Sequence, residues 1–205
     1  MNQSKRARRF PMPFAVFCFL ASAVFPSVSR AQVPVFAVTP EDSSIKFFVK
    51  ASVALEGKFE KWDSTFTVTS TDVTTGVLNI TIQAGSVDTG SGMKDGKLKS
   101  KDFFDVEKDP LITFKSTKLV QTSPTTFEVD GNFTIRGVTK PEKLVLDVAG
   151  TRGSGQAHVT GTMAFDRKDY GMNSGIPFIK IADRVEVTVA LQVKRVSGPP
   201  LVFKE

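Results

Sequence analysis

Residues 184–194 read RVEVTVALQVK, and this stretch decides the fold class. Apolar side chains occupy every second position, at 185, 187, 189, 191 and 193, and polar side chains fill most of the positions between them. Successive side chains of a β-strand point to opposite faces, so a period of two indicates a strand with one dry and one wet face. Such half-buried strands are typical of antiparallel sheets. We therefore expect an all-β protein.

The same alternation recurs along the chain. It covers residues 45–53, 66–68, 78–82, 127–135, 144–148 and 159–165. Turn-forming clusters separate several of these runs, at 123–125, 138–141 and 151–155. About eight antiparallel strands are predicted. Because open apolar edges would promote aggregation, and because closure removes such edges, we expect the strands to form a barrel.

Two places depart from this pattern. Residues Met93–Asp109 are charged and carry Leu98, Phe103 and Phe104, so we expect a short helix or a lid segment there. Gly131 lies on the apolar face of a predicted strand, where glycine indicates a bend or the close approach of another group.

The first 31 residues have the composition of a secretory signal peptide. Four basic residues among the first nine precede the apolar run Phe10–Phe25, and Ser29 and Ala31 stand just before an expected cut at Gln32. The run is shorter than the ~20 residues that a membrane-spanning helix needs. We expect residues 1–31 to be removed and residues 32–205 to form one exported domain. An arginine pair in the basic segment leaves open the choice between the general secretory route and the twin-arginine route.

Charge and cysteine content exclude several functions. The chain has 27 basic and 21 acidic residues, but five of the basic ones lie in the leader, so the exported domain is nearly neutral. A neutral domain lacks the basic surface that nucleic-acid binding requires. The only cysteine, Cys18, also lies in the leader, so we expect neither a disulfide nor a cysteine metal site in the mature protein.

Catalytic and metal-binding signals are weak. The single histidine, His158, falls on a predicted strand and has no partners that would complete a catalytic triad. Four carboxylates lie close together in the sequence, at positions 102, 105, 107 and 109, but lysines at 101 and 108 would oppose a cation, which indicates a solvated loop. We expect no catalytic residue, no metal and no cofactor. One enzymatic alternative stays open, in which Asp166, Asp169 or Tyr170 acts as an acid or base on a lipid or quinone.

The interior of the barrel is expected to be rich in phenylalanine. Thirteen of the 18 phenylalanines lie after residue 31, against one tryptophan and one tyrosine. Phenylalanine buries a large area without needing a polar partner. An eight-stranded barrel is either filled by side chains or just wide enough for one small ligand. Composition therefore leaves both a filled core and a lining for an apolar guest open.

Seven short landmarks occur in order along the chain. They are Gly57-x-Phe59-x-x-Trp62, Ser86-Val87-Asp88-Thr89, Leu98-x-Ser100-x-Asp102-Phe103-Phe104-Asp105, Pro110-x-x-x-Phe114-x-Ser116, Gly131-x-Phe133-Thr134-Ile135-Arg136-Gly137-Val138-Thr139-Lys140, Arg167-x-Asp169-Tyr170-Gly171-Met172 and Ala182-Asp183-x-Val185. In these landmarks the chain resembles the YceI-like family of periplasmic polyisoprenoid-binding proteins, over nearly all of residues 35–194.

The resemblance implies a lipocalin-like barrel of eight antiparallel strands with a long apolar channel. It also implies a periplasmic location, the binding of isoprenoid chains, quinones or fatty amides, and no settled catalytic residues. The chain departs from the family at Lys50-Ala51-Ser52, where a histidine is frequent, at Asp166, where the family has asparagine, and at Tyr170, where it has phenylalanine.

Alternation and resemblance together predict a binding site for a long apolar lipid. The expected channel residues are Phe47, Val49, Phe59, Trp62, Phe66, Leu78, Ile80, Phe103, Phe104, Phe114, Phe133, Ile135, Phe165, Met172 and Val187. The expected headgroup contacts are Lys97, Arg136, Arg167 and Asp169. Desolvation would drive binding at ~0.8 kcal/mol per buried CH₂. A ligand-free structural or stress-related envelope protein is the other alternative, and transient membrane contact and homodimerisation are left open.

Overall fold

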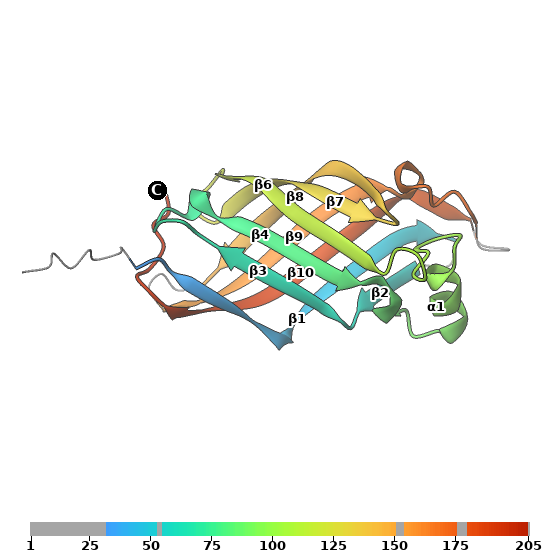
Figure 1. The fold of residues 1–205 in the computed structure, drawn as a ribbon, viewed down its shortest axis with the longest axis horizontal. Helices are drawn as coiled ribbons and strands as arrows, with labels where there is room; N and C mark the ends of the chain where they lie inside the picture. The colour runs from blue at the N-terminus through green and yellow to red at the C-terminus, as the bar shows by residue number, and fades with distance from the viewer. Residues whose placement is uncertain (1–31, 53–54, 151–153, 176–179, 205) are drawn as a thin grey trace, which may run out of the picture. The chain divides into compact units, whose positions relative to one another are not determined.

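The computed structural model describes residues 32–52, 55–150, 154–175 and 180–204. Its ten strands form one antiparallel sheet in the order β3-β4-β6-β7-β8-β9-β10-β1-β2-β5 (Figure 1). The strands are β1 (Val35–Ala51), β2 (Leu55–Phe59), β3 (Trp62–Thr67), β4 (Val77–Gln83), β5 (Val87–Asp88), β6 (Leu111–Gln121), β7 (Thr126–Ile135), β8 (Val138–Ala149), β9 (Gln156–Asp166) and β10 (Ile181–Ser197). The α-helix is α1 (Gly92–Lys99), and the 3₁₀ turns are η1 (Val73–Thr75), η2 (Ala84–Ser86) and η3 (Arg167–Tyr170). The predicted leader, residues 1–31, lies outside the described residues.

The all-β antiparallel fold is confirmed, with ten strands instead of eight. The additional elements are short: β2 has five residues and β5 has two, too few for a period of two to stand out. A register shift between Ser116 and Lys118 interrupts β6. A β-bulge of this kind places one extra residue in the strand and breaks the alternation on either side of it.

The connection between β7 and β8 corrects a predicted turn. Residues 138–141, expected as a turn, lie inside β8, and Pro141 pairs with Asn132 of β7. The chain reverses instead at Arg136 and Gly137, which have φ angles of 54° and 71°. Two consecutive positive φ values define the tight hairpin turn whose twist matches that of the flanking strands.

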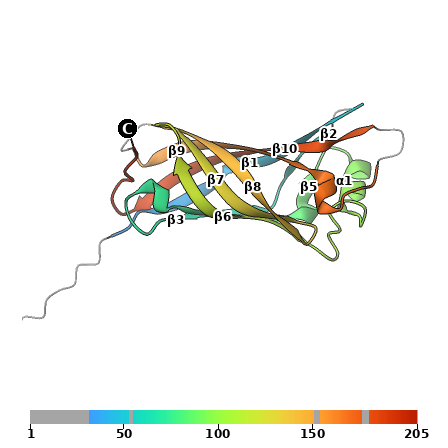
Figure 2. The same cartoon turned by 90° about the horizontal axis from the view of Figure 1, so that it is seen from above.

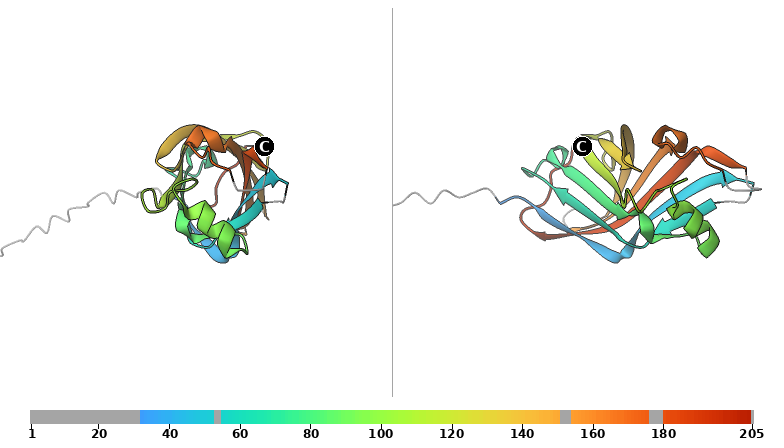
Figure 3. Two further views of the ribbon diagram at one scale, coloured as in Figure 1. Left: turned by 90° about the vertical axis from the view of Figure 1, so that its right-hand side faces the viewer. Right: turned by 45° about the vertical axis from the view of Figure 1, so that its right-hand side comes forward.

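The sheet curls until its two sides meet. The hydrogen-bonded ladder ends at β3 on one side and at β5 on the other. Within the described residues, β1 contacts β3 through side chains and not through backbone pairing. The rings of Phe36 and Phe66, for example, lie edge to face with their centroids 5.7 Å apart. Seen end-on, the ribbons surround a common axis (Figure 3). We refer to this contact between β1 and β3 as the seam.

Different segments occupy the two ends of the barrel. The helix α1 lies at one end and the C-terminus at the other (Figure 2). Leu98 of α1 is buried, as are Phe103 and Phe104 of the turns that follow it, so the predicted short helix is present. The turns of residues 100–109 are here called the lid segment. In the described part of the chain, none of the helices is long and apolar enough to span a membrane.

Candidate functional site

A cavity of about 140 Å³, here called the inner cavity, lies inside the barrel. Strands β1, β3, β4 and β6–β10 supply most of its wall. The lining residues are Phe36, Val38, Ser64, Phe66, Val73, Leu78, Ile80, Leu119, Phe127, Leu144, Leu146, Val148, Ala157, Val159, Val189, Leu191, Val193, Leu201 and Phe203. Every one of them except Ser64 is apolar, so the inner cavity suits an apolar guest.

A second, smaller cavity of about 60 Å³ lies toward α1 and is here called the helix-end cavity. Strands β1, β2, β4, β6, β7, β9 and β10 contribute to its walls, and Leu98, Phe103 and Phe104 belong to its lining. The remaining lining residues are Ile45, Phe47, Val49, Leu55, Phe59, Ile82, Ile112, Phe133, Ile135, Phe165, Arg167, Met172, Ile181, Val185 and Val187. Arg167 is the charged member of this set.

Buried side chains divide the two cavities. Phe114, Val129 and Met163 are buried but line neither cavity, and each lies between residues of the two sets along its own strand. Phe114 packs against Gly131, where an added Cβ would lie 2.5 Å from the Phe114 Cζ atom. The close approach expected at Gly131 is therefore confirmed. We call Phe114, Val129 and Met163 the septum.

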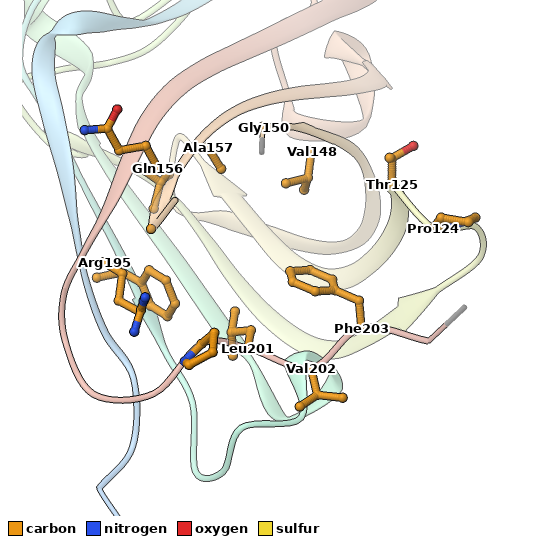
Figure 4. Close-up of a pocket in the computed structure, with 14 residues that line it drawn as sticks. Pro124, Thr125, Val148, Gly150, Gln156, Ala157, Arg195, Leu201, Val202 and Phe203 are labelled. Carbon is orange, nitrogen blue, oxygen red and sulfur yellow. The ribbon is translucent and has the colours of Figure 1, made fainter. Parts of the chain in front are cut away.

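The inner cavity adjoins an open pocket of about 390 Å³ at the C-terminal end, here called the mouth. The two spaces share six lining residues, namely Phe36, Val148, Ala157, Val193, Leu201 and Phe203. Leu201 and Phe203 point into the mouth, whose lining also includes Val202 (Figure 4). These two side chains therefore separate the inner cavity from the mouth.

Backbone hydrogen bonds fix the segment that carries these side chains, residues 199–204, here called the strap. The N–H of Val202 donates to the Thr71 carbonyl at 2.8 Å, and its carbonyl accepts from the N–H of Val73 at 3.3 Å. The side-chain amide of Gln121 accepts from the N–H of Lys204 at 2.7 Å and donates to the Lys204 carbonyl at 2.8 Å. The strap is thus tied to η1 and to the end of β6.

Arg167 was expected to contact a ligand headgroup, but its guanidinium group is occupied by the protein. Its Nε donates to the carbonyl of Ala182, one Nη donates to the carbonyls of Met172 and Ser174, and the other donates to Asp183 at 3.1 Å. The residue is only 6% exposed. Charge-assisted hydrogen bonds of this kind are roughly twice as strong as neutral ones. Arg167 therefore pins the segment after η3 to the start of β10.

Arg136, the second predicted headgroup contact, also binds backbone. Its two Nη atoms donate to the carbonyls of Gly171 and Lys101, the latter at 2.7 Å. These bonds tie the β7–β8 turn to the lid segment and to the end of η3. Because carbonyls occupy both Nη groups, Arg136 holds the helix end of the barrel together.

The other two predicted headgroup contacts are ion pairs near the surface. Lys97 lies 2.6 Å from Asp102, and this contact holds the pKa of the Asp102 carboxyl below its usual value. Asp169 pairs with Lys140 at 3.4 Å, and its side chain is 58% exposed. Neither Lys97 nor Asp169 lines the inner cavity or the helix-end cavity. None of the four predicted headgroup residues lines the inner cavity.

A family model for the YceI-like domain matches residues 36–193, which is most of the chain. The chain belongs to the YceI-like family. A UPF0312 protein of Pseudomonas aeruginosa is 33% identical to this YceI-like chain over 122 residues, which are 58% of this chain and 63% of the relative. A UPF0312 protein of Pectobacterium atrosepticum is 38% identical over 96 residues, 47% of this chain and 50% of the relative. The match thus spans less than two thirds of the length of these relatives.

Solved structures share the fold of this YceI-like chain. BcnA of Burkholderia cenocepacia superposes with a TM-score of 0.69 at 23% identity, over 76% of this chain and 99% of BcnA. A polyisoprenoid binding domain of Saccharophagus degradans gives a TM-score of 0.61 at 14% identity, over 79% of this chain and 99% of that domain. At these identities the likeness concerns the fold.

Most predicted channel residues of the YceI-like chain line a cavity. The helix-end cavity contains Phe47, Val49, Phe59, Phe103, Phe104, Phe133, Ile135, Phe165, Met172 and Val187. The inner cavity contains Phe66, Leu78 and Ile80, whereas Phe114 is in the septum and the half-buried Trp62 lines neither cavity. Alternation could also have found Phe127, Leu144 and Leu191. No sequence pattern identified Leu201 and Phe203 as lining residues, because they lie beyond the last predicted strand.

The acid–base candidates of the YceI-like chain do not form a catalytic group. Asp166 accepts a hydrogen bond from the N–H of Lys168 at 2.9 Å and so caps η3. His158 is exposed on β9. The carboxylates at 102, 105, 107 and 109 do not gather, and no cluster of three or more histidine, cysteine or acidic side chains suited to a metal occurs among the described residues.

Tyr170 is fully buried in an aromatic cluster. Its ring lies edge to face against Phe133 and Phe165, with centroid distances of 5.5 and 5.2 Å. Its hydroxyl donates to Glu142 at 2.8 Å. Burial, followed by this bond to a carboxylate, raises the pKa of the Tyr170 phenol far above its usual value. The phenol therefore stays protonated and is poorly suited to act as a base.

We expect alkaline pH to destabilise the protein through Tyr170. The phenol of the unfolded chain ionises near pH ~10, whereas the folded protein resists ionisation. The stabilisation is complete below that pH and is lost above it, at up to ~1.4 kcal/mol per pH unit. Above pH ~10, the free energy of unfolding of the wild type should therefore fall faster than that of Tyr170→Phe. Tyr170 is the only tyrosine, so tyrosinate absorbance that rose while the protein was still folded would contradict this expectation.

Proposed function

We propose that the protein binds a long-chain isoprenoid or a related lipid and stores or carries it in the periplasm. The observation that carries this proposal is the inner cavity, whose lining is apolar except for Ser64. The candidate ligands are a polyprenyl chain, an isoprenoid quinone or a fatty amide. Export would depend on the leader, residues 1–31. Transient membrane contact and homodimerisation stay predictions.

The fold and the energetics support this proposal. The domain from Saccharophagus degradans with the same fold is a polyisoprenoid binding domain. Transfer of each CH₂ group from water into the barrel would contribute ~0.8 kcal/mol. The cost of immobilising the chain and ordering the side chains around it offsets part of this gain. Affinity would therefore grow with the length of chain that the barrel encloses.

Cavity size determines how a long chain could fit. Ligand pockets usually measure about 300–1,000 Å³, whereas the inner and helix-end cavities measure about 140 and 60 Å³. A long isoprenoid therefore requires movement of the septum, of the strap or of both. The mouth, at about 390 Å³, lies next to the inner cavity and is the proposed point of entry.

A binding role fits the site better than catalysis. The Tyr170 phenol is committed to Glu142 and held protonated, and Asp169 lies near the surface beside Lys140. The second candidate is a structural envelope protein without a ligand, and the small volume of the two cavities inside the barrel favours it.

Analysis of lipid bound to the purified protein tests the proposal. The full chain would be expressed in a Gram-negative bacterium, recovered from the periplasmic fraction, extracted with organic solvent and analysed by mass spectrometry. We expect an N-terminus at Gln32 and one class of isoprenoid or fatty lipid in near-stoichiometric amount. A protein that emerges lipid-free, and in which geranylgeraniol does not displace the apolar dye N-phenylnaphthylamine, would favour the structural role.

A further inference from the structure

Ser64 is the one polar side chain that lines the inner cavity. It lies on β3 between Trp62 and Phe66, at an inward-facing position where the alternation of the strand favours an apolar residue. Its hydroxyl oxygen is buried and has no hydrogen-bond partner among the described residues. Ser116, two strands away on β6, differs in this respect, because its Oγ accepts a hydrogen bond from the N–H of Leu78 at 2.8 Å.

An unpaired buried hydroxyl needs an explanation. Buried polar groups in native proteins nearly always have a partner, because leaving one unpaired forfeits the hydrogen bond that it made with water. Alanine at position 64 would avoid that cost. The hydroxyl borders a cavity, so a bound molecule can supply the partner that the protein does not.

We propose that Ser64 Oγ forms a hydrogen bond with a neutral oxygen of the bound lipid, such as an alcohol, a ketone or a quinone carbonyl. This inference rests on the proposed function and specifies the ligand class. The lining of the inner cavity contains no charged side chain. An ionised phosphate or carboxylate would be buried there without a counter-charge, which is far more costly than burying a neutral group. Ser64 therefore selects neutral, oxygen-bearing isoprenoids.

The position of Ser64 also gives the orientation of the ligand. Ser64 pairs with Ile80 of β4, and Ile80 pairs with Phe114 of the septum. Ser64 thus lies at the septum end of the inner cavity, whereas Leu201 and Phe203 lie at its mouth end. A lipid whose oxygen meets Ser64 enters with its polar end first and leaves its tail toward the mouth.

The test compares Ser64→Ala with wild type for two probes of equal length. One probe is geranylgeraniol and the other is the hydrocarbon in which hydrogen replaces its hydroxyl group. Both are measured by displacement of N-phenylnaphthylamine. A third probe, geranylgeranyl diphosphate, carries a charged end. The control variant is Thr65→Ala, which removes a hydroxyl from the next residue of β3, where the side chain is exposed.

We expect Ser64→Ala to weaken geranylgeraniol binding about three- to tenfold, the range of one hydrogen bond, and to leave hydrocarbon binding unchanged. The urea midpoint of the ligand-free variant should equal or exceed that of wild type. Thr65→Ala should change neither affinity, and wild type should bind the diphosphate more weakly than the alcohol. An unchanged affinity ratio between alcohol and hydrocarbon in Ser64→Ala, or tighter binding of the diphosphate, would overturn this inference alone. If wild type bound neither geranylgeraniol nor the hydrocarbon, the proposed function would fail with it.

Discussion

Replacing Arg167 with methionine is expected to lower the free energy of unfolding by about 3–5 kcal/mol, the range seen when one partner of a buried charged network is removed. The guanidinium group is buried and binds three backbone carbonyls and Asp183. Methionine fills a similar volume but cannot donate hydrogen bonds. The carbonyls of Met172, Ser174 and Ala182 would lose a donor that water cannot fully replace.

Urea unfolding of Arg167→Met and of Arg184→Met checks this expectation. Arg184 is a matched control, because its side chain is 68% exposed and pairs only with Glu186 among the described residues. An exposed ion pair contributes at most about 1 kcal/mol. If Arg167→Met costs no more than the control, Arg167 is not a structural pin and its role as a headgroup contact regains support.

Locking the strap is expected to slow ligand exchange at least tenfold. Asp72 and Val202 form an isolated parallel β-bridge between η1 and the strap. Paired strands lie about 4.8 Å apart, which is within the Cα separation that a disulfide spans. In a Cys18→Ser background, Asp72→Cys with Val202→Cys should therefore form a disulfide that holds Leu201 and Phe203 between the mouth and the inner cavity. Each tenfold change in rate corresponds to about 1.4 kcal/mol in the barrier.

The comparison is made within one protein, between its oxidised and reduced states. Release of N-phenylnaphthylamine and uptake of geranylgeraniol would be followed by fluorescence before and after addition of a reductant. Asp72→Cys alone controls for the loss of the side-chain cap that Asp72 gives to η1 through the N–H of Thr74. Equal exchange rates in the oxidised and reduced states would mean that ligand does not pass the strap.

The period of two made most of the sheet predictable. It placed β7, β9 and β10 and their inward faces, because these strands have 10, 11 and 17 residues and keep a regular register over most of their length. The segment at residues 93–109, which holds most of α1 and the turns after it, was visible as a break in that period. The short strands β2 and β5, and the bulge in β6, gave no lasting alternation to detect.

The site could be predicted only where it is built from alternating side chains. Cavity-lining residues such as Phe47 and Leu78 follow from strand faces. The roles of Arg136 and Arg167 could not be predicted from the sequence, because both side chains bind backbone carbonyls that come close only in the folded chain. Leu201 and Phe203 line the mouth because of hydrogen bonds to Thr71 and Gln121, residues more than 80 positions away in the sequence. Single-residue properties carry no information about such contacts.

The seam has a mechanical consequence for the barrel. Where β1 faces β3, the described residues meet through ring and side-chain contacts such as that of Phe36 with Phe66, without ladder pairing. Parting these two strands would expose some apolar surface but would leave the hydrogen-bonded ladder whole. The barrel can therefore widen by separation of β1 from β3, and its interior can then hold a ligand wider than the two cavities.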